Sequence, residues 1–120
     1  MLKGKDVIKL AAVGAGTYVL KSAFSRLFEY DLKDKTALIT GGSRGLGLVM
    51  AREFAREGSR LVLCARDEQE LEQARHDLEK LGAEVMVVSC DVTNQQDVKA
   101  MIAAVYTRFG AVDVLVNNAG

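Results

Sequence analysis

From residue 31 onward, the chain alternates between short apolar runs and longer stretches in which apolar residues recur at helical spacing. The short runs are mainly aliphatic and β-branched and show no polar alternation, which is typical of strands buried on both faces. They lie at residues 36–40, 60–65, 84–90 and 112–116. The stretches between them predict amphipathic helices at residues 46–57, 67–82 and 93–110.

Local signals predict where these helices begin and end. Asp67 and Glu70 have the spacing of a capping box, in which the first side chain accepts from the helix backbone and the second reaches back. Thr93 and Gln96 repeat that spacing before the third helix. Glycine readily adopts the left-handed conformation that ends helices, and one follows each apolar stretch. These glycines are Gly58, Gly82 and Gly110.

Strands separated by single helices predict an α/β fold with a doubly wound parallel sheet. Right-handed crossovers place the four strands, numbered along the chain, in the order 3-2-1-4. The winding reverses between the first and the fourth strand, and ligands of such sheets bind there, beyond the carboxyl ends of the strands. The fourth strand is expected to lie at an edge, with no partner on its outer side.

Residues 1–30 differ from the rest, because they carry five basic and two acidic side chains while the other ninety residues have a net charge of −3. The uncharged run from Leu10 to Leu20 would span about 17 Å as a helix, too short for a hydrocarbon core of about 30 Å. A longer span would bury Lys21 and Arg26, each at a cost of about 2.5–3.5 kcal/mol. We expect an apolar, basic helix that rests on a membrane surface or on a partner. The alternative is an extension packed on its own domain.

The same segment contains Gly14 and Gly16, which match the first two glycines of a G-x-G-x-x-G loop, but Val19 stands where the third should be. The residues before them do not have the pattern of a strand, so the strand-turn-helix context of a phosphate site is missing. We therefore assign this partial motif to the N-terminal extension.

Composition excludes several classes of protein. Sixteen basic and sixteen acidic side chains balance, which removes the electrostatic basis for wrapping nucleic acid. With 49% hydrophobic and 27% charged residues, the chain is not disordered as a whole. Cys64 and Cys90 are too few for a disulfide framework, and His76 has no second histidine with which to share a metal. We expect buried, reduced thiols, a cytoplasmic location and no metal site.

The turn after the first strand, T-G-G-S-R-G-L-G from Thr40 to Gly47, carries the candidate chemistry. Its glycines permit a tight turn, a close approach of backbone to phosphate, and close packing of the helix on the strand. The helix that follows presents free N–H groups and a partial positive charge, which suit a pyrophosphate. Together these features predict a dinucleotide-binding site.

Two further motifs follow this loop in order: C-D-V from Cys90 to Val92, and N-N-A-G from Asn117 to Gly120. The three motifs together resemble the short-chain dehydrogenase/reductase family. The resemblance implies a Rossmann-like domain over residues 31–120 that is incomplete at its C-terminus. It also implies the residues that contact the cofactor, which are Gly41, Ser43, Arg44, Gly45, Leu46, Gly47, Arg66, Asp91, Val92, Asn117, Ala119 and Gly120.

Charge at the end of the second strand distinguishes the two dinucleotides. A carboxylate there accepts from the ribose 2′-OH of NAD and repels the 2′-phosphate of NADP. In this sequence Ala65 holds that position, Arg66 follows it, and Arg44 adds a second cation from the glycine loop. Arginine pairs well with phosphate, so we expect NADP(H) rather than NAD(H).

The family resemblance also implies hydride transfer between the nicotinamide and a carbonyl or alcohol substrate, carried out by a Tyr-x-x-x-Lys pair and a serine. None of Tyr18, Tyr30 and Tyr106 is followed four residues later by lysine, so we assign no catalytic residue to this chain. We expect the N-terminal dinucleotide-binding portion of an NADP(H)-dependent oxidoreductase whose complete form is a homo-oligomer. The alternative is a stand-alone, non-catalytic NADP-binding module.

Overall fold

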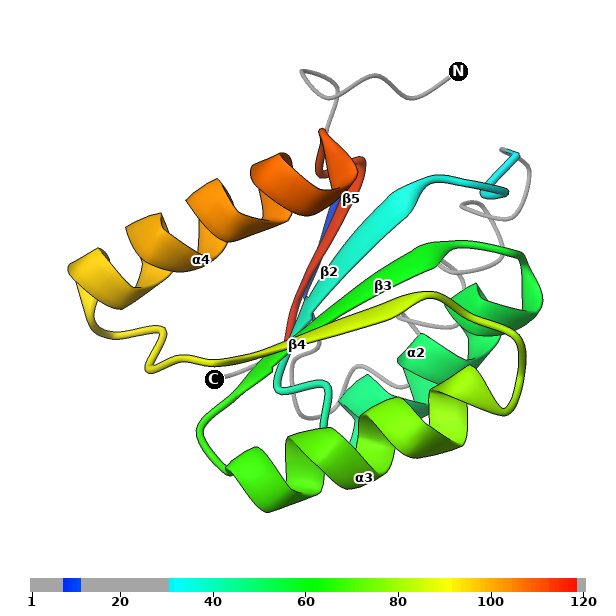
Figure 1. The fold of residues 1–120 in the computed structure, drawn as a ribbon, viewed down its shortest axis with the longest axis horizontal. Helices are drawn as coiled ribbons and strands as arrows, with labels where there is room; N and C mark the ends of the chain where they lie inside the picture. The colour runs from blue at the N-terminus through cyan, green and yellow to red at the C-terminus, as the bar shows by residue number, and fades with distance from the viewer. Residues whose placement is uncertain (1–7, 12–30, 119–120) are drawn as a thin grey trace.

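A computed structural model describes residues 8–11 and 31–118 of the chain, and its strands form one parallel sheet (Figure 1). The strands are β1 Ile8–Ala11, β2 Thr36–Thr40, β3 Arg60–Ala65, β4 Val85–Ser89 and β5 Val114–Asn117. The helices are α2 Gly45–Arg56, α3 Glu68–Glu79 and α4 Gln95–Phe109. The order across the sheet is β1-β5-β2-β3-β4. The four predicted strands therefore stand in the order 3-2-1-4, which confirms the doubly wound α/β prediction.

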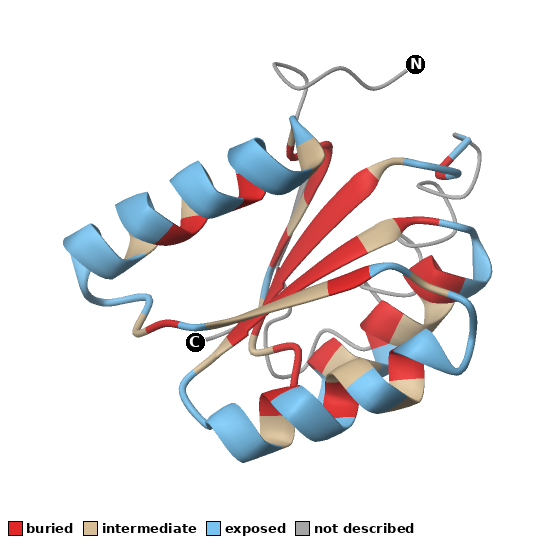
Figure 2. Cartoon of the chain, viewed as in Figure 1, coloured by how far each residue is buried: buried red, intermediate tan, exposed pale blue. Residues whose placement is uncertain are grey.

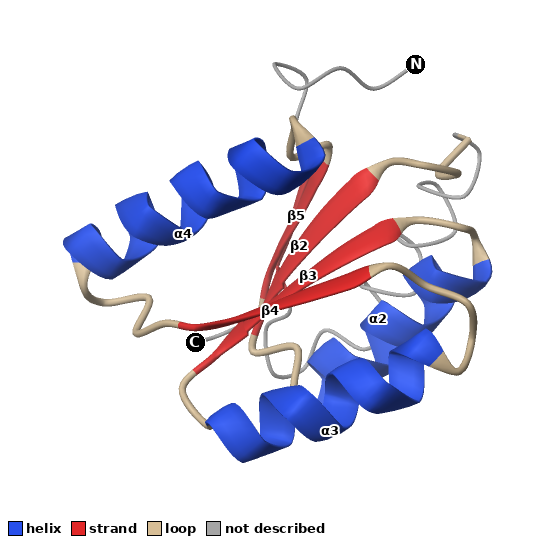
Figure 3. Cartoon of the chain, in the orientation of Figure 1, coloured by secondary structure: helices blue, strands red, loops and turns tan. Residues whose placement is uncertain are grey.

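Helices cover both faces of the sheet, with α2 and α3 on one side and α4 on the other (Figure 3). Successive side chains of a strand point to opposite faces. In β2, Ala37 and Ile39 accordingly pack with α2 and α3, whereas Leu38 packs with α4. Phe54 of α2 is fully buried in the apolar layer between the sheet and the helices α2 and α3. Buried residues run along the strands and along the helix faces that meet them (Figure 2). Two apolar layers, one on each face of the sheet, therefore hold the strands in place, with their carboxyl ends together at one end of the sheet.

The helix caps match the prediction in part. Asp67 accepts hydrogen bonds from the backbone N–H groups of Gln69 and Glu70, so it caps α3 as expected. The expected cap of α4 at Thr93 is wrong, because Asn94 accepts from the first turn of that helix instead. The Thr93 hydroxyl and N–H both donate to an Asp91 carboxylate oxygen, and this tight turn delays the helix by one residue.

The fourth predicted strand begins two residues later than expected. Asp113 is buried, and its carboxylate accepts the backbone N–H of Thr36 at 2.9 Å while its own N–H donates to the Thr36 carbonyl. A side chain thus replaces one backbone acceptor where the strands begin, and the β2–β5 ladder starts at the pair Ala37 and Val114. Asp113 thus ties β2 to β5 at the end of the sheet where these strands begin.

The prediction of a helix throughout residues 1–30 is wrong at residues 8–11, which form β1. This strand runs parallel to β5, with Ile8 opposite Val114. The expected unpaired outer edge of the fourth strand is therefore also wrong. A strand edge exposes unpaired N–H and C=O groups, and β1 supplies partners for those of β5. The Gly14 and Gly16 motif lies outside the described residues.

Candidate functional site

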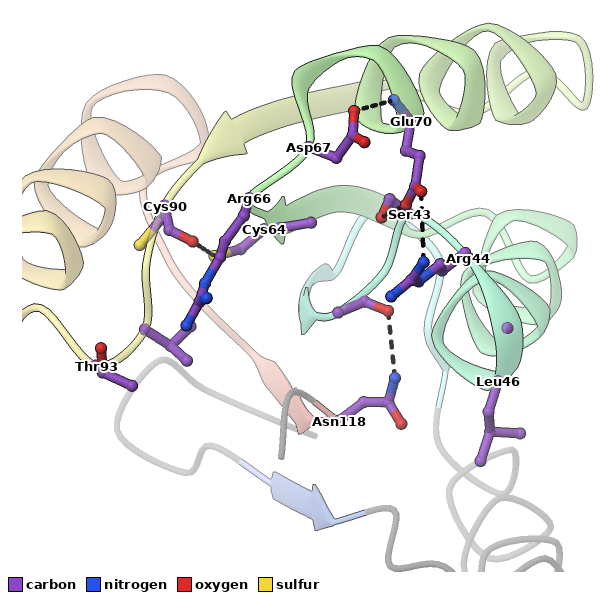
Figure 4. Close-up of a pocket in the computed structure, with 14 residues that line it drawn as sticks. Ser43, Arg44, Leu46, Cys64, Arg66, Asp67, Glu70, Cys90, Thr93 and Asn118 are labelled. Carbon is purple, nitrogen blue, oxygen red and sulfur yellow. Dashed lines mark hydrogen bonds and ion pairs between the residues drawn. The ribbon is translucent and has the colours of Figure 1, made fainter.

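A cavity of about 740 Å³ opens at the carboxyl ends of the strands, between the turn that follows β2 and the ends of β3 and β4 (Figure 4). This is where the reversal of winding predicts a ligand. Of the residues expected to contact a cofactor, those that line it are Gly41, Ser43, Arg44, Gly45, Leu46, Arg66 and Val92. It is also lined by Cys64, Ala65, Asp67, Glu70, Cys90, Thr93 and Asn118.

The glycine loop requires glycine for two different reasons, which are positive φ angles and one close backbone contact. Gly41 and Gly45 have φ values of 65° and 57°, a conformation that strains other residues. Gly47 does not line the cavity but lies behind it, where a Cβ would stand 2.1 Å from the carbonyl oxygen of Gly41. The N–H of Gly41 donates to the carbonyl of Cys64 at 2.7 Å, which fixes the loop to β3. The backbone therefore reaches the cavity wall directly.

The N-terminus of α2 faces this cavity without a side-chain acceptor among the residues the structure describes. Its N-cap, Arg44, has extended backbone and caps nothing, and the first turn carries no acidic side chain. By contrast, Asp67 caps α3 and Asn94 caps α4. The first N–H groups of a helix need acceptors, and an anion in the cavity would supply them together with a favourable interaction with the helix dipole.

Two arginines flank the cavity, and each pairs with a carboxylate. An Arg66 nitrogen donates to an Asp91 oxygen at 3.3 Å, and its side chain is 73% exposed. An Arg44 nitrogen lies 3.6 Å from a Glu70 oxygen, with the arginine side chain 82% exposed. Such exposed pairs contribute about 0–1 kcal/mol, so both guanidinium groups can turn to a stronger partner at little cost. Ala65 lines the wall beside Arg66 and brings no charge.

Asp91 does not line the cavity but stands beside it, held by Thr93 as well as by Arg66. Hydrogen bonds from the Thr93 hydroxyl and N–H, followed by the charge of Arg66, hold the pKa of Asp91 below its usual value. The carboxylate is therefore ionised throughout the neutral range. Its neighbours Val92 and Thr93 form that part of the wall.

The two adjacent asparagines have different roles, and Asn118, which lines the cavity, was not among the predicted cofactor contacts. Asn117 accepts from the Thr40 hydroxyl at 3.2 Å and serves as a tie between β5 and β2. Asn118 lines the cavity, with its side-chain amide donating to the Gly41 carbonyl at 3.2 Å. The end of β5 separates them, because Asn117 is its last residue and Asn118 is the first residue beyond it. Ala119 and Gly120 lie outside the described residues.

The cysteines at the cavity are free and buried, as predicted. Burial raises the pKa of the Cys64 thiol to about 12, and the neighbouring Cys90 adds to the rise. The thiol donates to the backbone carbonyl of Cys90. A thiol in this state is not a nucleophile near neutral pH. Over residues 8–11 and 31–118, no group of three or more histidine, cysteine or acidic side chains is placed to hold a metal. Within the same residues, no helix is both long and apolar enough to span a membrane.

Comparison with known proteins matches residues 35–120 to the family model described as short chain dehydrogenase. A putative ketoacyl reductase of Streptomyces coelicolor is 44% identical over 86 residues, which are 72% of this chain and 33% of the relative. The structure of L-sorbose reductase from Gluconobacter frateurii with NADPH and L-sorbose matches at a TM-score of 0.72 and 44% identity, covering 76% of this chain and 36% of that one.

The structure of an NAD⁺-bound xylitol dehydrogenase matches at a TM-score of 0.73 and 33% identity, covering 76% of this chain and 35% of that one. The chain thus spans about a third of the length of the proteins it matches. The structures matched include both NADPH-bound and NAD⁺-bound proteins, so the choice of dinucleotide must be argued from the residues of this cavity.

Proposed function

Since the chain belongs to the short-chain dehydrogenase family, we propose that residues 31–120 bind NADP(H) for an oxidoreductase that acts on a carbonyl or alcohol substrate. The observation that carries the choice of cofactor is the charge around one wall of the cavity. Ala65 holds the place where a carboxylate would favour NAD, and Arg44 and Arg66 line the same cavity. A 2′-phosphate placed there meets two cations able to donate in pairs.

The rest of the cavity suits the diphosphate and adenosine of the same cofactor. Gly47 packs closely against the Gly41 backbone, which itself lines the cavity. The uncapped start of α2 offers N–H groups to a pyrophosphate. We propose that Val92 lies against the adenine and that Asp91 accepts from its edge. Asn118 holds the floor of the cavity by its bond to Gly41. When bound, the nicotinamide supplies or accepts a hydride.

The structure assigns no proton donor for the reaction to the described residues. Tyr106, the single tyrosine among them, lies exposed on α4 and does not line the cavity. The proposal therefore concerns cofactor binding by this chain and a carbonyl or alcohol reaction in the complete protein, which we take to be a cytoplasmic homo-oligomer.

Binding of two cofactor fragments tests the proposal without any catalytic step. The 120-residue chain is titrated by calorimetry with 2′,5′-ADP and with 5′-AMP, which differ by the 2′-phosphate. We expect 2′,5′-ADP to bind at least tenfold more tightly, with a preference that falls as salt is added, because exposed arginines supply it. Equal affinities would refute the NADP assignment, and failure of both fragments to bind would refute the site itself.

A further inference from the structure

A carboxylate stands inside the cavity beside one of the arginines that the proposed function assigns to the 2′-phosphate. One oxygen of Glu70 accepts from the Ser43 hydroxyl at 3.1 Å, and the other lies 3.6 Å from an Arg44 nitrogen (Figure 4). The Glu70 side chain is 36% exposed. It therefore bridges α3 to the glycine loop across the space that the phosphate would approach.

The local structure of α3 explains why Glu70 is available for this contact. Its position predicts a capping box, in which its carboxylate would reach back to the N–H of Asp67. The structure shows half of that motif, since Asp67 caps the helix while the Glu70 side chain turns to Ser43 and Arg44. Asp67 also lines the cavity, but its carboxylate is committed to two backbone N–H groups. Glu70 is thus the lining carboxylate that faces the glycine-loop cation.

We infer that Glu70 limits the preference for NADP over NAD, because it competes with the 2′-phosphate for Arg44. A phosphate carries close to two negative charges, so it must both displace Glu70 from the guanidinium and tolerate the carboxylate nearby. NAD has a hydroxyl at that position and meets neither cost. Glu70 is therefore a specificity-determining residue whose charge opposes the two arginines. This inference rests on the proposed function and deepens it.

The arrangement at Arg66 differs, which is why the inference concerns Glu70 alone. Asp91 also pairs with an arginine, but its pairing oxygen is held by the Thr93 hydroxyl and N–H, and the residue does not line the cavity. Releasing Arg66 leaves that carboxylate hydrogen-bonded to Thr93 beside the cavity. Releasing Arg44 leaves the Glu70 carboxylate within it.

Glu70→Gln tests the inference, because glutamine keeps the size of the side chain and an oxygen for Ser43 while it removes the charge. Glu68→Gln is the matched control, since Glu68 is an exposed acidic residue in the same first turn of α3 and does not line the cavity. Each chain is titrated with 2′,5′-ADP and 5′-AMP at low and high salt. We expect Glu70→Gln to raise the ratio of their affinities about threefold to tenfold, and Glu68→Gln to change it less than twofold.

A double variant locates the effect at Arg44. In an Arg44→Ala background, Glu70→Gln should raise the ratio less than it does in the unaltered chain, because only the repulsion between the carboxylate and the phosphate is then left to remove. An unchanged or lowered ratio in Glu70→Gln would overturn the inference, as would an equal gain in Glu68→Gln. If the unaltered chain fails to discriminate between the fragments, the NADP assignment fails. A gain confined to Glu70→Gln would still support the role of Glu70 in that case.

Discussion

Replacing Arg66 with alanine removes a cation that faces the cavity and leaves the core untouched. The side chain is 73% exposed and contacts Asp91 at 3.3 Å, so the folded state loses little. A charge-assisted hydrogen bond to a phosphate contributes about 1.5–3 kcal/mol. Breaking the exposed pair with Asp91 offsets about 0–1 kcal/mol of that. The net loss of about 0.5–3 kcal/mol weakens NADP binding about 2- to 150-fold, while NAD binding should hardly change.

A second substitution should reverse the preference. Ala65 lines the cavity next to Arg66, and Ala65→Asp places a carboxylate where it accepts from the ribose 2′-OH and repels a 2′-phosphate. Combined with Arg66→Ala, it should favour NAD over NADP. The assay is calorimetric titration of each variant with both dinucleotides, and the ratio of the two affinities is the quantity that decides.

The matched control is Arg52→Ala, which removes an arginine from α2 that does not line the cavity. It should leave the ratio as it is in the unaltered chain. If Arg66→Ala lowers both affinities equally, the role given to Arg66 is wrong, because the residue would then stabilise the site without contacting the 2′-phosphate. A preference for NAD in the unaltered chain would refute it at the outset.

Three further predictions concern the glycine loop, the Asp91 turn and the core. Gly47→Ala should abolish fragment binding in calorimetry, because the new Cβ would stand 2.1 Å from the Gly41 carbonyl oxygen and force the loop to move. Thr93→Ala should raise the pKa of Asp91 toward its usual value in an NMR titration, since the Thr93 hydroxyl is the main cause of the lowering. The stability that this lowering supplies is present at neutral pH and is lost as the pH falls through the pKa of Asp91 in the folded protein. Phe54→Ala should cost about 3–5 kcal/mol in denaturant unfolding, because the fully buried ring leaves a cavity.

The central strands were predictable because their pattern is local. Residues 36–40 and 60–65 are continuous apolar runs bounded by turn residues, and both match the observed strands β2 and β3. Their buried, hydrophobic character leaves one placement, at the middle of a covered parallel sheet. The glycine loop was predictable for a related reason, since the spacing of its glycines indicates where the backbone turns tightly and where helix and loop pack closely.

The features that escaped prediction depend on partners far away in the chain. No local sequence signal near residues 8–11 indicates a strand, and β1 forms by pairing with the outer side of β5. Glu70 has a capping spacing, but the Ser43 and Arg44 side chains draw its carboxylate elsewhere. Asn118 enters the cavity because β5 ends one residue before it. For β1 and for Glu70, a contact with a distant part of the chain decided the structure.

The pairing of β1 with β5 has a consequence for the order of folding. Ile8 meets Val114, a separation of 106 residues, whereas β2 pairs with β3 and β3 with β4 at separations of 24 residues, from Thr36 to Arg60 and from Leu61 to Val85. Closing so long a loop is entropically costly until the rest of the sheet is in place. We therefore expect β1 to pair only after β5 has joined the rest of the sheet. Pairing of β1 with β5 would therefore follow the assembly of the central βαβ units.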